Sequence, residues 1–169
     1  QQCITAAASG KHIFVEKPLG LTVDECLEVV QAVEQSQVLC AIGFNRRFSS
    51  LSISLRDSLS NVVSPKQIIY RVNAGRLPQE HWLLDPEIGG GRLLGEGCHF
   101  FDYMSWLLDT NAVSVIAQAA GDSSDDISVV VKYSDGSIGT LIYTALGSTE
   151  FSKERIEIFA GGGVGVIDD

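Results

Sequence analysis

The chain has 169 residues, with 12 Lys or Arg against 21 Asp or Glu, and a formal net charge of −9. Nucleic-acid binding depends on clustered positive charge, so this balance argues against a nucleic-acid partner. The 45% hydrophobic content excludes a disordered chain, and no apolar run approaches the roughly 20 residues that a membrane helix needs. Because residues 1–10 show no signal peptide and the four cysteines form no C-x-x-C pair, we expect a cytoplasmic protein with reduced thiols, no membrane partner and no metal site.

The acidic excess is confined to the second part of the sequence. Residues 1–92 contain nine basic and nine acidic side chains, whereas residues 93–169 contain three and twelve. An anionic ligand, if there is one, should therefore meet the first part of the chain.

Residues 1–44 alternate between helical and strand patterns. Gln2–Ser9 is the end of an Ala-rich helix, and His12–Glu16 is an apolar run typical of a buried parallel strand. The sequence Thr22–Glu25 has the form of a capping box, which opens a helix, and Val38–Ile42 is the next strand. Strand, helix and strand within about thirty residues predict a parallel βαβ unit. In its helix, one apolar stripe that we expect to be buried carries Val23, Cys26, Leu27, Val30 and Val33.

After Phe44 the pattern changes. A helix is predicted over Arg47–Leu59, a strand over Gln67–Val72, a loop over Asn73–Ile88, and a second helix from about Arg92 to Leu108. In the first of these helices, one face carries Phe48, Leu51, Leu55 and Leu59.

The remainder of the sequence is predicted to be β. Strands are expected over Val113–Ala119, Ile127–Tyr133, Ile138–Ala145, around Ile156 and Ile158, and over Val164–Ile167. The fold class is therefore α+β: an open, mainly antiparallel sheet backed by helices, preceded by a parallel βαβ unit that forms the tail of a doubly wound sheet.

Two residues are candidates for chemistry. Lys17 directly follows a predicted parallel strand, where ligands of α/β sheets bind, although a lone lysine there can also be a solvated charge. His99 has Glu96 three residues before it and Asp102 three residues after it, so either carboxylate could orient the imidazole for acid–base work. The alternative for His99 is a core histidine among neighbouring aromatic residues.

Three further side chains are candidates for binding. Arg46 and Arg47 could bind an anion, or could be solvated residues at the start of a helix. Trp82 offers an aromatic face to a sugar ring, or packs in the core. The clusters Gly89–Gly91 and Gly161–Gly165 do not have the strand–G-x-G-x-x-G–helix form of a dinucleotide loop. Gly161–Gly165 is typical of a turn or bulge, whereas Gly89–Gly91, at the start of a helix, would allow a ligand to approach the backbone.

Taken in order, Gly10–Leu19 with its E-K-P sequence, Gly43–Phe48, Asp85–Leu94 and Cys98–Asp102 resemble the Gfo/Idh/MocA family, the relatives of glucose–fructose oxidoreductase and inositol dehydrogenase. The resemblance implies an NAD- or NADP-dependent oxidoreductase acting on a sugar or cyclitol, with a Rossmann domain and an α+β domain whose open sheet face mediates homo-oligomers. By this resemblance, residues 1–44 are the C-terminal βαβ remnant of the Rossmann, dinucleotide-binding domain, and residues 45–169 are a substrate-binding and oligomerisation α+β domain, incomplete at its C-terminus. It implies that Lys17 lies near nicotinamide and substrate, and that His99 exchanges the hydroxyl proton.

From these motifs we assign Lys17 and His99 as catalytic, and Glu16, Lys17, Pro18 and Arg46 as cofactor-binding. The substrate-binding assignments are Arg47, Trp82, Glu96 and Asp102.

The chain departs from the family pattern in two places. Many members carry an Asp four residues before the histidine, where this chain has Gly95. The glycine-rich loop of the Rossmann domain is also absent, so we expect these 169 residues alone to be inactive. Two alternatives to a sugar or cyclitol dehydrogenase stay open: an NAD-dependent glycosidase of the same family, and a non-catalytic binding or oligomerisation module.

Overall fold

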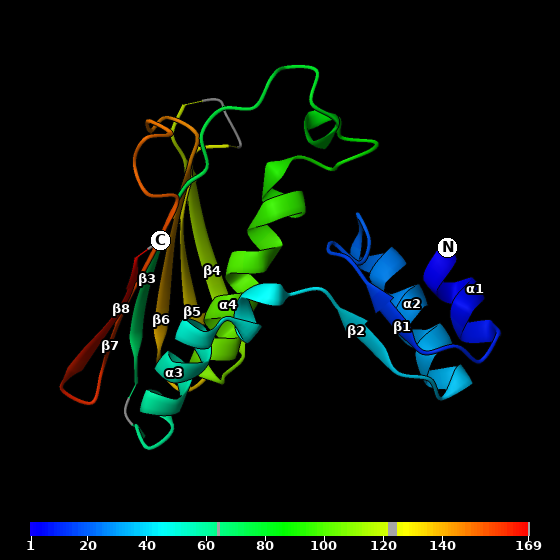
Figure 1. Cartoon of the computed structure of the whole chain (residues 1–169), viewed down its shortest axis with the longest axis horizontal. Coiled ribbons are helices and arrows are strands. Elements are labelled where there is room, and N and C mark those ends of the chain that lie inside the picture. Colours follow the sequence, from blue (N-terminus) through cyan, green and yellow to red (C-terminus); the bar gives the residue numbers. More distant parts are fainter. Residues whose placement is uncertain (64, 122–124, 169) are drawn as a thin grey trace. The chain divides into compact units, whose positions relative to one another are not determined.

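The computed structural model describes residues 1–63, 65–121 and 125–168, which form two compact units (Figure 1). The N-terminal unit consists of residues 1–44 and 82–98, and the C-terminal unit consists of residues 45–81 and 99–169. The second helix predicted from the sequence therefore begins in one unit and continues into the other.

The N-terminal unit is built on a βαβ element. It contains α1 (Gln2–Ala8), β1 (Ile13–Val15), α2 (Val23–Ser36) and β2 (Cys40–Ile42). Strands β1 and β2 pair in parallel, from Ile13 opposite Cys40 to Val15 opposite Ile42. The predicted parallel βαβ unit is confirmed.

Helix α2 begins as predicted, but only part of the predicted stripe is covered. The Thr22 side chain accepts a hydrogen bond from the Glu25 N–H, and the Glu25 carboxylate accepts one from the Thr22 N–H, which completes the capping box. The buried residue of the helix is Val29; of the predicted stripe, Cys26 and Val33 are half-buried, whereas Val23, Leu27 and Val30 are exposed. The prediction was wrong for these three because α2 packs chiefly against the short helix α1, which covers only part of its surface.

The rest of the N-terminal unit is a loop with two short helical turns. Trp82–Leu84 form a 3₁₀ turn and Leu93–Gly97 form a π turn, from which α4 (Cys98–Leu108) follows. The sequence predicted one regular helix here. Gly95 and Gly97 interrupt it because glycine is among the poorest helix formers.

The C-terminal unit contains a six-stranded sheet in the order β4-β5-β6-β3-β7-β8. Its neighbouring strands are antiparallel except for β3 and β6, which pair in parallel. The predicted open, mainly antiparallel sheet is therefore confirmed. The strands are β3 (Gln67–Asn73), β4 (Ala112–Ala119), β5 (Ile127–Tyr133), β6 (Ile138–Thr144), β7 (Glu154–Ala160) and β8 (Gly163–Asp168).

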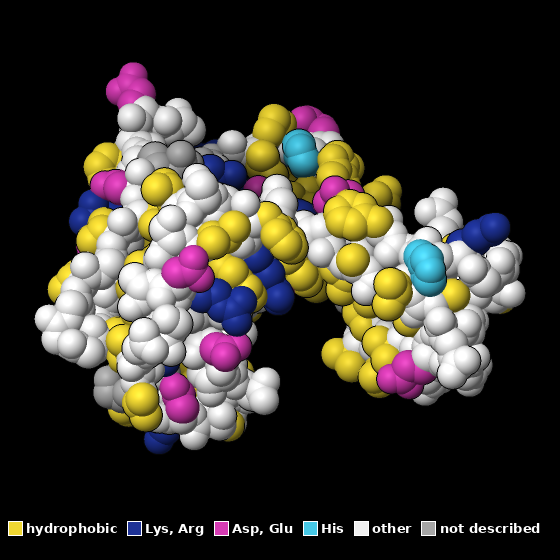
Figure 2. Space-filling model, turned by 60° about the horizontal axis from the view of Figure 1, so that its bottom comes forward, with side chains coloured by type: hydrophobic (Ala, Val, Ile, Leu, Met, Phe, Trp, Pro, Cys, Tyr) yellow, Lys and Arg dark blue, Asp and Glu magenta, His cyan; other side chains and the backbone are white. Residues whose placement is uncertain are grey.

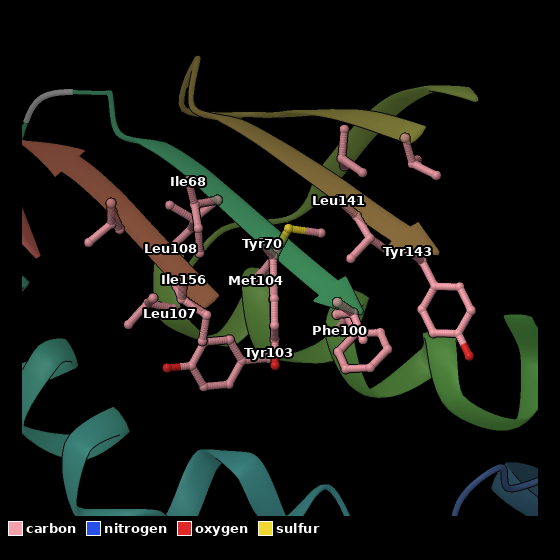
Figure 3. Packing of buried hydrophobic residues seen from close by; sticks show 14 of the residues in the cluster. Ile68, Tyr70, Phe100, Tyr103, Met104, Leu107, Leu108, Leu141, Tyr143 and Ile156 are labelled. Atoms are coloured by element: carbon pink, nitrogen blue, oxygen red, sulfur yellow. The ribbon is translucent and has the colours of Figure 1, made fainter. Parts of the chain in front are cut away.

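One face of this sheet is covered by α4. Tyr70 of β3 lies against Phe100 and Tyr103 of α4, with ring centroids 5.1 Å and 5.6 Å apart in edge-on geometry. Figure 3 shows these rings among the aliphatic side chains of the same core, including Met104 and Leu141. The cluster fixes the first turns of α4, and with them His99, against the middle of the sheet.

Helix α3 (Ser50–Leu59) follows a 3₁₀ turn over Asn45–Phe48. The predicted face is only half correct, because Leu55 and Leu59 pack against the core whereas Phe48 and Leu51 are exposed. Ser52 is buried instead, and its hydroxyl accepts a hydrogen bond of 3.0 Å from the Tyr103 hydroxyl. Because its hydroxyl has a hydrogen-bond partner, Ser52 can be buried without a large desolvation penalty. A pattern of hydrophobic residues does not predict such a buried serine.

The opposite face of the sheet carries exposed apolar side chains. Along β5 the residues alternate between buried and exposed, and on the exposed side of the sheet lie Val130, Ile142, Phe159, Val164 and Val166. Figure 2 shows yellow apolar side chains spread over the molecular surface, with blue and magenta charged side chains lying beside each other. Among the described residues, no helix is long and apolar enough to cross a membrane.

Candidate active site

The carboxyl end of the β1–β2 pair presents a charged sequence. Glu16 and Lys17 follow β1 directly, and the peptide bond between Lys17 and Pro18 is cis. A Cβ atom added to Gly43, which follows β2, would lie 3.0 Å from Glu16 Oε2, so the carboxylate packs directly on the glycine backbone. Glu16 and Lys17, which the sequence predicted to follow a strand, thus lie at the edge where both parallel strands end.

The triple glycine forms a tight turn in the same unit. The N–H groups of Gly89 and Gly90 donate to the Asp85 carbonyl, and the Gly91 N–H donates to the Leu83 carbonyl. Gly90 has a φ of +69°, a conformation that glycine adopts without strain. Because all three glycine N–H groups have backbone partners, the cluster acts here as a structural turn rather than an open anion-binding loop.

The π turn that follows carries the contact to Lys17. The Lys17 ammonium donates a hydrogen bond to the carbonyl oxygen of Gly95, 78 residues away in the sequence. Arg92, whose side chain is 1% exposed, spans the turn through an ion pair of 3.1 Å with Glu96. Lys17, predicted from its strand-end position, and the segment that leads to His99 are therefore joined by a direct contact within the N-terminal unit.

His99 lies in the first turn of α4, four residues after Gly95, and is 8% exposed. The two carboxylates proposed to orient it both meet arginines. Glu96 pairs with Arg92, and Asp102 accepts hydrogen bonds from Nε and Nη2 of Arg47, with Nε 2.7 Å from Oδ2. The predicted substrate ligands Arg47 and Asp102 thus bind each other in bidentate geometry, which leaves their substrate-binding role a prediction.

Arg46 takes part in a separate network in the C-terminal unit. Its guanidinium donates two hydrogen bonds to the Glu154 carboxylate, which also accepts one from the Tyr70 hydroxyl. The Cζ atom of Arg46 lies over the Phe100 ring, 4.9 Å from the ring centroid. The network lines a pocket of about 420 Å³ together with Tyr103 and other residues. A cofactor that bound Arg46, as expected from the sequence, would therefore have to compete with the Glu154 carboxylate.

Burial and hydrogen bonding shift the ionisation of this network. Burial raises the pKa of Glu154, but the hydrogen bonds from Arg46 and Tyr70 and the Arg46 charge outweigh it, so the pKa lies below its ordinary value. Burial and the neighbouring Glu154 carboxylate raise the pKa of the Tyr70 phenol. At neutral pH the network is thus an ion pair with a neutral tyrosine.

Trp82 and Pro18 complete the predicted set. Trp82 is 60% exposed in the N-terminal unit, so its ring is accessible to a ligand, and Pro18 is half-buried beside Lys17. Sequence reasoning missed Glu154, Tyr70 and the Gly95 carbonyl. The alternation along β7 could have placed Glu154 on the buried side, but a backbone acceptor has no signature in the sequence.

Comparison with known proteins assigns both parts of the chain. Residues 1–44 match the family model described as oxidoreductase family, NAD-binding Rossmann fold, and residues 64–164 match the GFO/IDH/MocA C-terminal domain. A myo-inositol 2-dehydrogenase of Thermotoga maritima is 27% identical over 170 residues, covering 95% of this chain and 50% of the relative. A scyllo-inositol 2-dehydrogenase (NAD⁺) of Bacillus subtilis is 31% identical over 115 residues, covering 66% of this chain and 32% of the relative.

Solved structures share the fold. A probable dehydrogenase from Thermotoga maritima aligns with a TM-score of 0.80 at 24% identity, covering 99% of this chain and 52% of that chain. The WlbA dehydrogenase from Bordetella pertussis, in complex with NADH and UDP-GlcNAcA, aligns with a TM-score of 0.85 at 20% identity, covering 99% and 54%. The chain thus spans about half the length of this myo-inositol 2-dehydrogenase and of these solved structures. With both segments matched in order and the C-terminal match alone covering more than half of the residues, the chain belongs to the GFO/IDH/MocA family of NAD-binding oxidoreductases.

Proposed function

We propose that the whole protein is an NAD- or NADP-dependent dehydrogenase that oxidises a hydroxyl group of a sugar or cyclitol, with Lys17 and His99 as its catalytic residues. The observation that carries this proposal is the bond from Lys17 at the strand end to Gly95, four residues before His99. The names of the inositol dehydrogenase relatives support a cyclitol as the substrate class.

The residues at the β1–β2 edge fit one end of a dinucleotide. Glu16 can accept hydrogen bonds and Lys17 can donate them, which suits the ribose hydroxyls and carboxamide of a nicotinamide nucleoside. No G-x-G-x-x-G sequence for the pyrophosphate occurs in the 169 residues. When bound, the cofactor supplies the hydride acceptor, and Glu16, Lys17 and Pro18 would line its nicotinamide end.

The protein side chains then have two tasks. His99 accepts the hydroxyl proton of the substrate as the oxygen begins to carry negative charge. The Lys17 ammonium stabilises that developing charge, because it is a cation fixed by a hydrogen bond rather than a mobile surface lysine. Burial of the imidazole limits competition from water for the same proton.

The binding roles of Arg46, Arg47, Trp82, Glu96 and Asp102 belong to the same proposal. Trp82 offers an exposed ring to the apolar face of a cyclitol, and the four charged residues can exchange hydrogen bonds with polar groups of cofactor or substrate. Association of copies through the open sheet face is supported by its exposed aliphatic side chains, such as Ile142 and Val166.

The test is NADH formation by the whole protein with myo-inositol and scyllo-inositol as probes. Lys17→Met and His99→Asn should each lower kcat by at least about 100-fold, the usual worth of a positioned acid–base group. Lys11→Met, at an exposed lysine of the same unit, is the matched control and should leave the rate unchanged. Rates within about threefold of wild type in both variants would exclude this catalytic pair, and NADH formed in proportion to oxidised cyclitol would exclude the glycosidase alternative.

A further inference from the structure

We propose that the π turn Leu93–Gly97 is a positioning element for Lys17, in which the backbone carbonyl of Gly95 sets the place of the ammonium. The catalytic consequence of this inference rests on the proposed function, whereas the contact itself can be tested without turnover. Gly95 would then be a positioning residue that acts through Lys17.

The contact is specific because each partner is fixed by its own element. Lys17 is half-buried and lies two residues beyond the last residue of β1, so its backbone is anchored by the parallel pair with β2. The acceptor is a main-chain atom in a turn whose hydrogen-bond pattern differs from that of an α-helix, and such turns occur frequently at functional sites.

Three contacts fix the orientation of the Gly95 carbonyl. The Gly95 N–H donates to the Gly91 carbonyl at 2.9 Å, and the buried Arg92 bridges the turn to Glu96. The third contact is steric: a Cβ atom at position 95 would overlap Cδ1 of Leu83. Only glycine lets the turn lie this close to the Leu83 side chain, so any larger residue must displace one of the two.

The chemistry of the acceptor also matters. Among the described residues no carboxylate pairs with Lys17, so its hydrogen bond goes to a neutral oxygen. A carbonyl orients an ammonium without cancelling its charge, which remains available to stabilise an oxyanion. At this turn the chain therefore uses a main-chain oxygen to hold the lysine.

The contact is tested by competitive acetylation of the lysines with trace acetic anhydride, read by mass spectrometry. Gly95→Ala should raise the reactivity of Lys17 by about tenfold, which corresponds to the loss of about 1.4 kcal/mol of hydrogen bonding. The exposed Lys11 in the same digest is the internal control and should not change. Circular dichroism checks that the variant is folded.

A second variant keeps the test decisive if Gly95→Ala disturbs folding. Leu83→Ala removes the side chain that the new Cβ would overlap, so the double variant Leu83→Ala/Gly95→Ala should return Lys17 to within about twofold of the reactivity in Leu83→Ala alone. Lys17 reactivity that stays at the wild-type level in folded Gly95→Ala, or that rises equally in the double variant, would overturn the proposal.

Kinetics of the whole protein with NAD⁺ and myo-inositol then separate positioning from general stability. Gly95→Ala should lower kcat more than it raises KM, and in a Lys17→Met background it should cause no further loss, because its effect passes through Lys17. Equal losses in both backgrounds would refute positioning. If acetylation responds as expected but Lys17→Met turns over normally, the contact stands and the proposed function fails.

Discussion

The replacement Glu154→Gln tests whether the network of Arg46, Glu154 and Tyr70 anchors the 3₁₀ turn Asn45–Phe48, which precedes α3, to the sheet. The Glu154 carboxylate accepts two hydrogen bonds from Arg46 and one from Tyr70, across 108 and 84 residues of sequence. Glutamine preserves the size of the side chain and one accepting oxygen, but it removes the charge and turns an N–H₂ group toward one or more of the donors. The substitution therefore removes the ion pair and at least one hydrogen bond while leaving the packing almost unchanged.

The expected loss of stability follows from how deeply the Arg46–Glu154 pair is buried. The side chains of Arg46 and Glu154 are 25% and 16% exposed, between a surface pair and a fully buried one. Surface pairs contribute up to about 1 kcal/mol, and breaking a buried pair costs about 3–5 kcal/mol. We expect Glu154→Gln to lower the free energy of unfolding of the C-terminal unit by about 2–3 kcal/mol, between these limits.

The assay is urea unfolding followed by tryptophan fluorescence. The chain has two tryptophans, so in a Trp82→Phe background the signal reports Trp106 of α4 alone. Glu157→Gln is the matched control on the same strand, because Glu157 pairs with Arg155 and both side chains are about one-third exposed. The control should lose less than about 1 kcal/mol. Equal losses in the two variants would refute the anchoring role of Glu154.

Wild type and Glu154→Gln should also differ in how their stability depends on pH. Since the pKa of Glu154 is lower in the folded than in the unfolded protein, its contribution is complete above the unfolded value of about 4.3 and is lost as the pH falls through the folded value. The stability difference between wild type and Glu154→Gln should therefore shrink as the solution is acidified below about pH 4. A difference that grows on acidification would contradict the downward shift.

Two further substitutions test local contacts. Thr22→Ala removes the side-chain acceptor for the Glu25 N–H, so it should cost about 1 kcal/mol and speed hydrogen exchange in the first turn of α2; unchanged exchange there would show that the capping box contributes nothing. The buried carboxylate of Asp126 accepts hydrogen bonds from the Thr144 hydroxyl (2.6 Å) and the Ala145 N–H (2.8 Å). Asp126→Asn should lower the urea midpoint by an amount equivalent to about 1–3 kcal/mol, and a midpoint equal to that of wild type would contradict the role of the charge.

The strands could be predicted from the sequence because their signal is local. In β5, Ile127, Val129 and Val131 alternate with exposed residues, and this period of two is visible without knowing any neighbour. The capping box of α2 is equally local, since both of its partners lie within four residues. These elements needed no tertiary information.

The buried faces of α2 and α3 could not be predicted in the same way. Val29 is buried in α2 and Ser52 in α3, because the choice depends on which surfaces each helix meets rather than on its own apolar stripe. Ser52 is a clear case: its burial requires the Tyr103 hydroxyl, 51 residues away. A hydrophobic pattern contains no information about such a partner.

The candidate site likewise contains residues that the sequence predicts and contacts that it does not. Lys17 and His99 could be proposed from the sequence because residue type and motif carry their signal, and their catalytic role stays a prediction. A main-chain carbonyl such as that of Gly95 is common to every residue type, so the sequence does not indicate its contact with Lys17. The pairing of Arg46 with Glu154 was equally hidden, because nothing in either local sequence specifies a contact across 108 residues.

The pairing of the arginines bears on the substrate class. From sequence alone, Arg46 and Arg47 were candidates to grip an anion, yet Glu154 and Asp102 already satisfy them within the C-terminal unit. An anionic substrate would have to compete with two bidentate carboxylates, each of which costs free energy to displace. A neutral polyol needs no such exchange, because its hydroxyls can both donate to carboxylates and accept from a single cation. The charge arrangement therefore favours a neutral cyclitol over a sugar phosphate in the function proposed for this protein.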